Sequence, residues 1–128
     1  MRSGWRANRQ HSANRGNMKR SGDFRLNTFA EYSELYCPVC QGPNIHQGRV
    51  AVFQRGEDGV KTFQTIVSGE KADVAVVDSS QCANPSSRRQ GLRIEFDCEN
   101  CHSREPNTFI ALTISQHKGF TELSWEFG

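Results

Sequence analysis

Apolar residues are scarce in this sequence. Only 35% of its 128 residues are hydrophobic, which is below the usual share for a globular domain. A chain of this length is most simply one domain, and a small polar domain buries little apolar surface. We therefore expect a thin core that needs an additional stabilising element, such as a bound metal.

Long apolar runs are also missing. No segment approaches the ~18 consecutive apolar residues that a membrane-spanning helix needs. The N-terminal region carries charge without an apolar core, unlike a secretory signal peptide. We expect a cytoplasmic protein without a membrane partner. In a reducing compartment, cysteines are more often metal ligands or catalytic groups than disulfides.

Sequence signatures of catalysis are absent as well. The sequence contains no glycine-rich phosphate loop, no nucleophile elbow and no His-Glu metalloprotease motif. The acidic residues are scattered, so no carboxylate pair for acid–base work stands out. The sequence predicts a protein that is not an enzyme and takes no small-molecule substrate.

Charge is distributed unevenly along the chain. Residues 1–30 contain seven basic residues and one acid, a net charge of +6, whereas 31–128 contain nine basic and thirteen acidic residues, a net charge of −4. A basic arm before an acidic body is typical of an interaction tail. Residues 1–27 are rich in Arg, Asn, Ser and Gly, so we predict a disordered basic arm there.

Two basic segments are candidates for binding DNA or RNA through release of counterions from phosphates. One is the arm, and the other is the polar loop at 84–91. The candidate residues are Arg2, Arg6, Arg9, Arg15, Lys19, Arg20, Arg88 and Arg89. The alternative is that the arm only keeps the protein in solution, while the loop arginines compensate the negative charge of a nearby metal site.

Periodicity predicts a mainly β protein. Thr28 and Glu31 have capping-box spacing and the aromatic residues of 28–36 share one face, which predicts a short N-terminal helix. Alternating or β-branched runs predict six strands, at 49–53, 62–67, 73–77, 92–97, 109–114 and 121–127.

The strand expected at 92–97 alternates strictly between apolar and charged residues. Leu92, Ile94 and Phe96 are predicted to face the core, and Arg93 to face solvent.

Two Cys-x-x-Cys pairs, with 57 residues between them, are the strongest signal in the chain. They are Cys37 with Cys40 and Cys98 with Cys101. Zn²⁺ takes four tetrahedral ligands, and a two-residue gap lets both sulfurs of a pair reach one ion. Four thiolates leave no open coordination position, so we predict one structural zinc ion.

Three other interpretations of the cysteine pairs stay open. Iron in a rubredoxin-like site uses the same four ligands. A redox role for Cys37 requires a helix N-terminus, which the following "QGPN" disfavours. The segment "CENCH" at 98–102 matches a haem attachment motif, but the chain has no export signal.

Isolated cysteine and histidine residues are weaker candidates. Cys82 lies in a polar loop without a histidine within a few residues, so we interpret it as a free thiol. His46 and His102 lie beside the cysteine pairs, but four cysteines already complete a tetrahedral shell.

The long gap between the pairs indicates an insertion. The predicted fold is an antiparallel zinc-ribbon-like β domain at 28–128, with an inserted β subdomain at about 54–90. One short helix and the disordered basic arm precede its strands.

Three strings carry a resemblance to known proteins: "CPVCQGPNIHQGRVAVFQRGEDG" (37–59), "NPSSRRQGLRIEFDCENC" (84–101) and "ISQHKGFTELSWE" (114–126). Together they resemble a group of small uncharacterised zinc-ribbon-like proteins encoded by phages and integrative mobile elements. The resemblance covers roughly 37–126 and implies a metal site and a mobile-element context, without implying a reaction.

Our first functional hypothesis is a non-enzymatic accessory protein that associates with nucleic acid through its arm. The alternative is a protein–protein interaction module or an inhibitor of a host protein complex, in which the partner is a host or element-encoded protein. An enzyme that uses Cys82 or a histidine is a third hypothesis, which the sequence supports least.

Overall fold

The computed structural model describes residues 18–101 and 108–128, and predictions that concern 1–17 or 102–107 lie outside this part of the chain. The described part is almost entirely β structure, with a single turn of 3₁₀ helix at Ser79–Gln81. The strands are β1 (Lys19–Ser21), β2 (Leu26–Thr28), β3 (Ser33–Leu35), β4 (Ile45–Gln54), β5 (Lys61–Ser68), β6 (Lys71–Asp78), β7 (Gly91–Cys98), β8 (Ile110–His117) and β9 (Phe120–Phe127).

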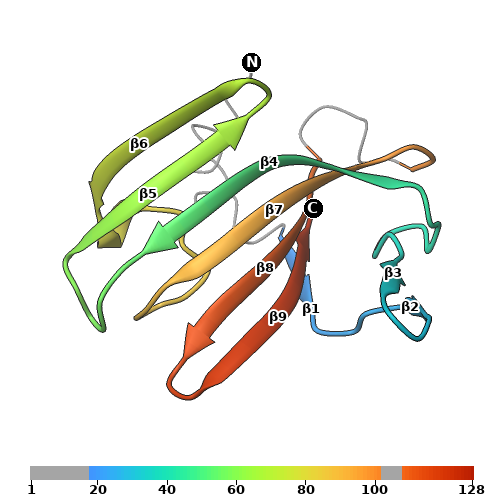
Figure 1. The fold of residues 1–128 in the computed structure, drawn as a ribbon, viewed down its shortest axis with the longest axis horizontal. Coiled ribbons are helices and arrows are strands. Elements are labelled where there is room, and N and C mark those ends of the chain that lie inside the picture. The colour runs from blue at the N-terminus through green and yellow to red at the C-terminus, as the bar shows by residue number, and fades with distance from the viewer. Residues whose placement is uncertain (1–17, 102–107) are drawn as a thin grey trace.

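Seven strands form one antiparallel sheet with the order β1-β9-β8-β7-β4-β5-β6, and β2 pairs with β3 in a separate hairpin (Figure 1). The sheet consists of two meanders, β4-β5-β6 and β7-β8-β9, joined where β4 pairs with β7. The mainly β, antiparallel prediction is confirmed. The expected inserted subdomain at about 54–90 is not separate, because β5 and β6 continue this same sheet.

The predicted helix at 28–36 is wrong, because these residues form the β2–β3 hairpin. The Phe29 N–H donates to the Tyr32 carbonyl at 2.8 Å, which closes a tight turn, and the two rings pack at a tilt with centroids 5.0 Å apart. Both rings are exposed, so the aromatic periodicity reflects a contact within the turn and not a buried helical face. A helix of this length is marginal in water without a buried face. Among the described residues, no helix is long and apolar enough to cross a membrane.

The expected disordered arm at 1–27 is ordered over its described part. Residues 19–21 form β1, which pairs with the outer edge of β9. An uncovered strand edge presents unpaired N–H and C=O groups, and β1 satisfies those of β9 at this end. Residues 1–17 of the expected arm lie outside the described part.

The covered core lies at one end of the sheet, between β7, β8 and β9 and the β2–β3 hairpin. Its fully buried members are Cys37, Cys98, Ile110 and Trp125. The Trp125 ring packs against Phe24 at 5.5 Å between centroids, and Phe96 packs on it edge-on at 5.8 Å. The core is therefore built around two of the four paired cysteines.

The side-chain orientation predicted for 92–97 is found only at the end of β7 that lies beside the covered core. Phe96 packs against the core, whereas Leu92 and Ile94 remain partly exposed. Arg93, predicted to face solvent, is only 3% exposed. Arg93 lies on the opposite face of β7, against which the loop after β6 packs at Gly91, where a Cβ would lie 2.3 Å from the Asn84 side-chain oxygen.

An ion pair compensates the buried charge on this loop-covered face. The Arg93 guanidinium donates to the carboxylate of Glu126, which is also buried. The same guanidinium lies 5.6 Å from the centroid of the Phe109 ring. A buried arginine is tolerated when a carboxylate pairs with it.

Candidate metal centre

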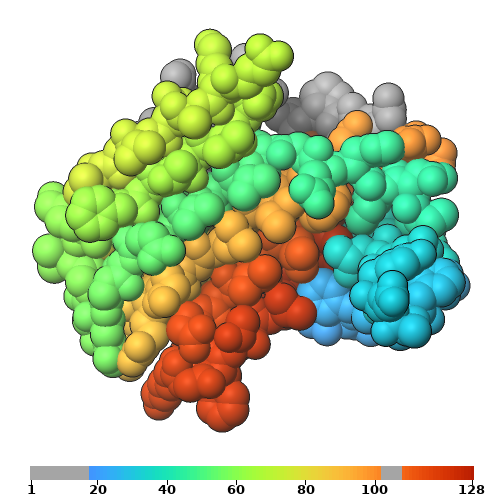
Figure 2. Space-filling view, in the orientation of Figure 1, coloured from blue at the N-terminus to red at the C-terminus, as the bar shows by residue number. Residues whose placement is uncertain are grey.

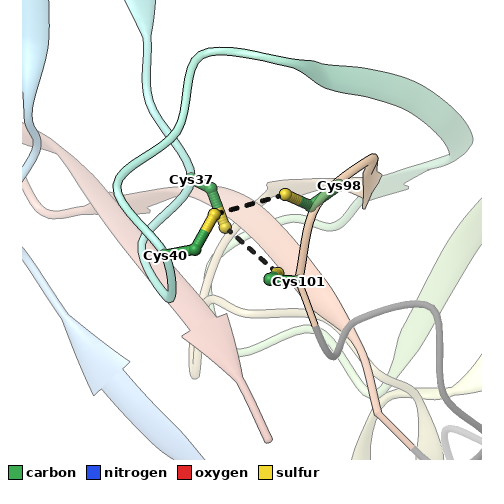
Figure 3. Close-up of side chains that lie close together, drawn as sticks. All are labelled: Cys37, Cys40, Cys98 and Cys101. Carbon is green, nitrogen blue, oxygen red and sulfur yellow. Dashed lines mark hydrogen bonds between the residues drawn. The ribbon is translucent and has the colours of Figure 1, made fainter.

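Four cysteine side chains converge at the covered end of the sheet (Figure 3). The Sγ atoms of Cys37, Cys40, Cys98 and Cys101 all lie within 4.8 Å of one another. Cys98 is the last residue of β7, and β4 begins with Ile45 paired opposite it. Pairing of β4 with β7 therefore brings the first cysteine pair, which precedes β4, to the second, which ends β7.

The distances between the sulfur atoms suit a metal ion. The Sγ atoms of Cys37 and Cys101 are 3.7 Å apart, and those of Cys40 and Cys98 are 3.5 Å apart. A tetrahedron with metal–sulfur bonds of ~2.3 Å has edges of ~3.8 Å. A disulfide would require sulfur atoms ~2.05 Å apart. The arrangement is that of four thiols around one point, which is what a single metal ion needs.

The backbone of the first pair is folded into a tight turn around the sulfurs. The Cys37 N–H donates to the Gly42 carbonyl at 2.8 Å, and the Gln41 N–H donates back to the Cys37 carbonyl at 2.9 Å. Gln41 has a positive φ of 65°. The Val39 N–H points at the Cys37 sulfur at 3.3 Å, and such donors stabilise a thiolate.

Gly42 has a packing role in this turn that the sequence interpretation missed. A Cβ at Gly42 would lie 3.3 Å from the Cys40 sulfur, so a larger residue would crowd the site. The signal was present in the sequence, as a glycine two positions after the second cysteine of the pair.

Burial controls the protonation of the two inner thiols. Cys37 and Cys98 are fully buried, whereas Cys40 is exposed and Cys101 half-buried. Burial raises the pKa of Cys37 to about 12 and also raises the pKa of Cys98. A cation placed among the sulfurs would compensate the thiolate charge and displace these protons.

Of the two histidine candidates, His46 is not among the clustered ligands. The His46 ring forms a hydrogen bond with the Glu99 carboxylate, and this partly exposed pair lies outside the four-sulfur cluster. His102 lies outside the described residues. Cys82 is also separate, because its sulfur donates to the Ser79 carbonyl at 3.6 Å in the loop after β6.

The turn that follows Cys37 disfavours a redox role for the first cysteine pair. A reactive Cys-x-x-Cys thiol gains its low pKa at a helix N-terminus. Cys37 begins a turn instead of a helix, and its pKa is raised.

The described nucleic-acid candidates do not form one free basic surface. Arg88 contacts Asp58 at 2.7 Å and Glu57 at 3.0 Å, and Arg89 contacts Glu57 at 2.8 Å. The hydrogen bond from Arg88 lowers the pKa of Asp58. The positive charge of this loop is thus matched by a facing acidic turn.

The remaining candidates belong to the arm. Arg20 lies 3.6 Å from the Glu126 carboxylate, and Lys19 is exposed on β1. The other four, Arg2, Arg6, Arg9 and Arg15, lie outside the described residues.

Comparisons of this chain with protein-family models, with curated proteins and with solved structures find no match. Functional inference therefore starts from the cysteine cluster itself.

Proposed function

We propose that this chain is a non-enzymatic zinc-binding protein with a zinc-ribbon-like centre, in which one Zn²⁺ is held by Cys37, Cys40, Cys98 and Cys101. The observation that carries the proposal is the set of four mutually close sulfurs, whose two measured separations match the edges of a zinc–thiolate tetrahedron. Four thiolates leave zinc no position for a substrate, which supports a structural role.

The position of the site supports this structural role. Cys37 and Cys40 follow the β2–β3 hairpin, while Cys98 and Cys101 belong to the end of β7 and the turn after it. An ion shared by all four would fix the hairpin on the sheet and close the core around Trp125. Structural zinc sites contribute on the order of 10 kcal/mol or more to folding, which compensates for a small core.

Metal analysis of the purified protein tests the identity of the ion. We expect one zinc per chain and no visible absorption. Iron in a four-thiolate shell absorbs visible light, so a coloured, iron-containing protein would assign the same site to iron instead.

We further propose that the protein is an accessory factor of a mobile element, as the resemblance implies, and associates with DNA or RNA through its basic N-terminal region. The support is the charge of residues 1–30, which is +6 on a chain whose remainder carries −4. Arg88 and Arg89 contribute less than the sequence suggested, because Glu57 and Asp58 already pair with them.

A salt titration of nucleic-acid binding tests this association. Four arginines precede residue 18, and neutralising four phosphates gives a slope of about −3.6 in log K against log salt, so affinity should fall on the order of 100-fold between about 50 and 200 mM salt. Deletion of 1–17 keeps β1 and should abolish most of the binding. The matched control is Arg88→Gln, which removes a compensated charge and should leave the affinity unchanged.

The alternative function, a protein–protein interaction module or an inhibitor of a host complex, makes a different prediction. Its partner would remain bound after deletion of 1–17. Absence of binding to single- and double-stranded DNA and RNA at low salt would reject the nucleic-acid proposal and leave the zinc proposal intact.

A further inference from the structure

One face of the large sheet is apolar and lies open in the described structure. The register places one row of side chains across six strands, in the order Val74, Thr65, Val52, Leu92, Ile114 and Leu123. A second row contains Ala72, Val67, Val50 and Ile94 before it reaches the covered core. Phe63 and Val76 form a further cross-strand pair on the same face. We call these twelve residues the open face.

The open face is accessible at both of its ends. Val74 is 74% exposed and Leu123 is 50% exposed, although they lie at opposite ends of the same row. Figure 2 shows strands β4 to β9 from this side, and no other described segment lies over their middle. The polar loop after β6 packs against the opposite face, where Arg93 and Thr113 are buried.

Charge is almost absent from this face. Among its described strand positions, the ionisable residues are Lys61 and Asp78, which lie opposite each other at one corner, and Lys19 on β1, beside the covered core. The other rim positions are uncharged, with Gln54, Gln116 and Thr121 among them. Apart from the facing pair Lys61 and Asp78 at one corner and Lys19 at the β1 edge, such a face offers neither cations to a phosphate backbone nor carboxylates to a basic peptide.

The size of the face suits an interface between two proteins. Strands lie ~4.8 Å apart and alternate residues ~6.7 Å apart, so twelve positions cover on the order of 400 Å² of plane. The largest apolar patch on a monomeric protein is typically ~300–600 Å² and is often functional. A specific dimer buries ~800 Å² per partner, so an interface on this face would also include its polar rim.

We propose that a second copy of this chain covers the open face, so that two sheets pack face to face in a symmetric dimer. The twelve residues of the open face carry no charge, so two copies can meet there without repulsion between like charges, as a two-fold interface requires. Two such sheets pack with their strands within about 30° of each other and ~10 Å apart, and the apolar rows interdigitate. The chain's own undescribed segments do not match this chemistry, because 1–17 contains four arginines and 102–107 is polar and charged.

Sedimentation equilibrium and light scattering on the full-length, zinc-loaded protein test the proposal. We expect a species of twice the chain mass of 14.4 kDa. Val74→Lys and Leu123→Lys place a charge at each end of the central row, and should each weaken dimerisation at least 100-fold. Both side chains are largely exposed in the monomer, so the fold should survive, as circular dichroism would verify.

Val60→Lys is the matched control. Val60 is an equally apolar residue, 75% exposed, but it lies in the turn between β4 and β5 and outside the open face. This variant should dimerise like the wild type. The proposal does not depend on nucleic-acid binding, which the arm deletion tests separately.

Three results would overturn the dimer. The first is a wild-type protein that stays monomeric up to about 100 µM, far above the dissociation constant of a specific dimer. The second is a dimer that persists in both lysine variants, which would assign association to a sheet edge such as β6. The third is a monomer that floats with neutral lipid vesicles, which would assign the face to a lipid surface.

Discussion

Replacing Cys98 by serine removes one of four thiols from the metal centre and alters the covered core at the same time. Cys98 is fully buried and clusters with Cys37, Ile110 and Trp125. A neutral serine hydroxyl is a far poorer ligand for zinc than a thiolate, so the ion should be lost or bound weakly.

The size of the effect follows from two contributions. A structural zinc site contributes about 10–16 kcal/mol to folding, and the net stability of a domain is only about 5–15 kcal/mol. A hydroxyl buried among apolar side chains without a partner costs a further ~1–3 kcal/mol. Loss of the zinc contribution alone is therefore large enough to unfold the domain at room temperature.

The assay combines zinc content after gel filtration with urea unfolding. Trp125 is fully buried against Phe24 and Phe96, so in a Trp5→Phe background its fluorescence reports whether the core is intact. The wild type should contain one zinc and unfold cooperatively, while Cys98→Ser should contain none and show exposed tryptophan without denaturant.

Cys82→Ser is the matched control, because it changes the same atom outside the cluster. The Cys82 thiol is half-buried and makes a long contact with the Ser79 carbonyl, so we expect a loss below about 1 kcal/mol. A Cys98→Ser protein that is folded, free of zinc and as stable as Cys82→Ser would refute the metal assignment.

Four further predictions concern protonation and packing. Because burial raises the pKa of Cys37 to about 12, zinc must displace the proton of this thiol at neutral pH. Each displaced proton lowers the apparent affinity for zinc about tenfold per unit fall in pH. A series of chelator competitions that shows no pH dependence would contradict this. In metal-free protein the stability has the opposite pH dependence: the raised pKa of Cys37 stabilises the fold below the usual thiol pKa of 9.0, and this stabilisation disappears as the pH rises toward about 12. Glu126→Gln leaves the buried Arg93 without its counter-charge and should lower the free energy of unfolding by about 3–5 kcal/mol in urea titrations; a loss under about 1 kcal/mol would show that the pair is solvated. Gly91→Ala places a Cβ 2.3 Å from the Asn84 side-chain oxygen and should cost about 1–3 kcal/mol by thermal unfolding, and an unchanged midpoint would mean that the loop shifts freely.

The sequence by itself was sufficient to identify the four cysteines that cluster and the mainly β fold class. Two Cys-x-x-Cys pairs are informative because two residues is the spacing at which both sulfurs of a pair can reach one ion, so chemistry dictates the pattern. All four cysteines meet in the structure. Alternation in 92–97 and 121–127 likewise predicted strands, because side chains of a strand point alternately to two faces.

The sequence was misleading where a local pattern has two structural solutions. Phe29 and Tyr32 are three positions apart, which suits one face of a helix but also the two ends of a tight turn. The hairpin forms because neither ring has a core to bury against, while β2 and β3 can pair with each other. Such a choice depends on what surrounds the segment.

Only the tertiary structure decided which charges are compensated and which face of the sheet is covered. Arg88 and Arg89 meet their acidic partners across about 30 residues of sequence, as the sheet pairing brings two turns together. Alternation in the sequence defines the two faces of β7 but does not tell which face is covered. The loop after β6 decides this, since it packs on the face that carries Arg93, while Leu92 points to the other face. Such contacts depend on segments distant in sequence, whereas a cysteine pair carries its metal-binding geometry within four residues.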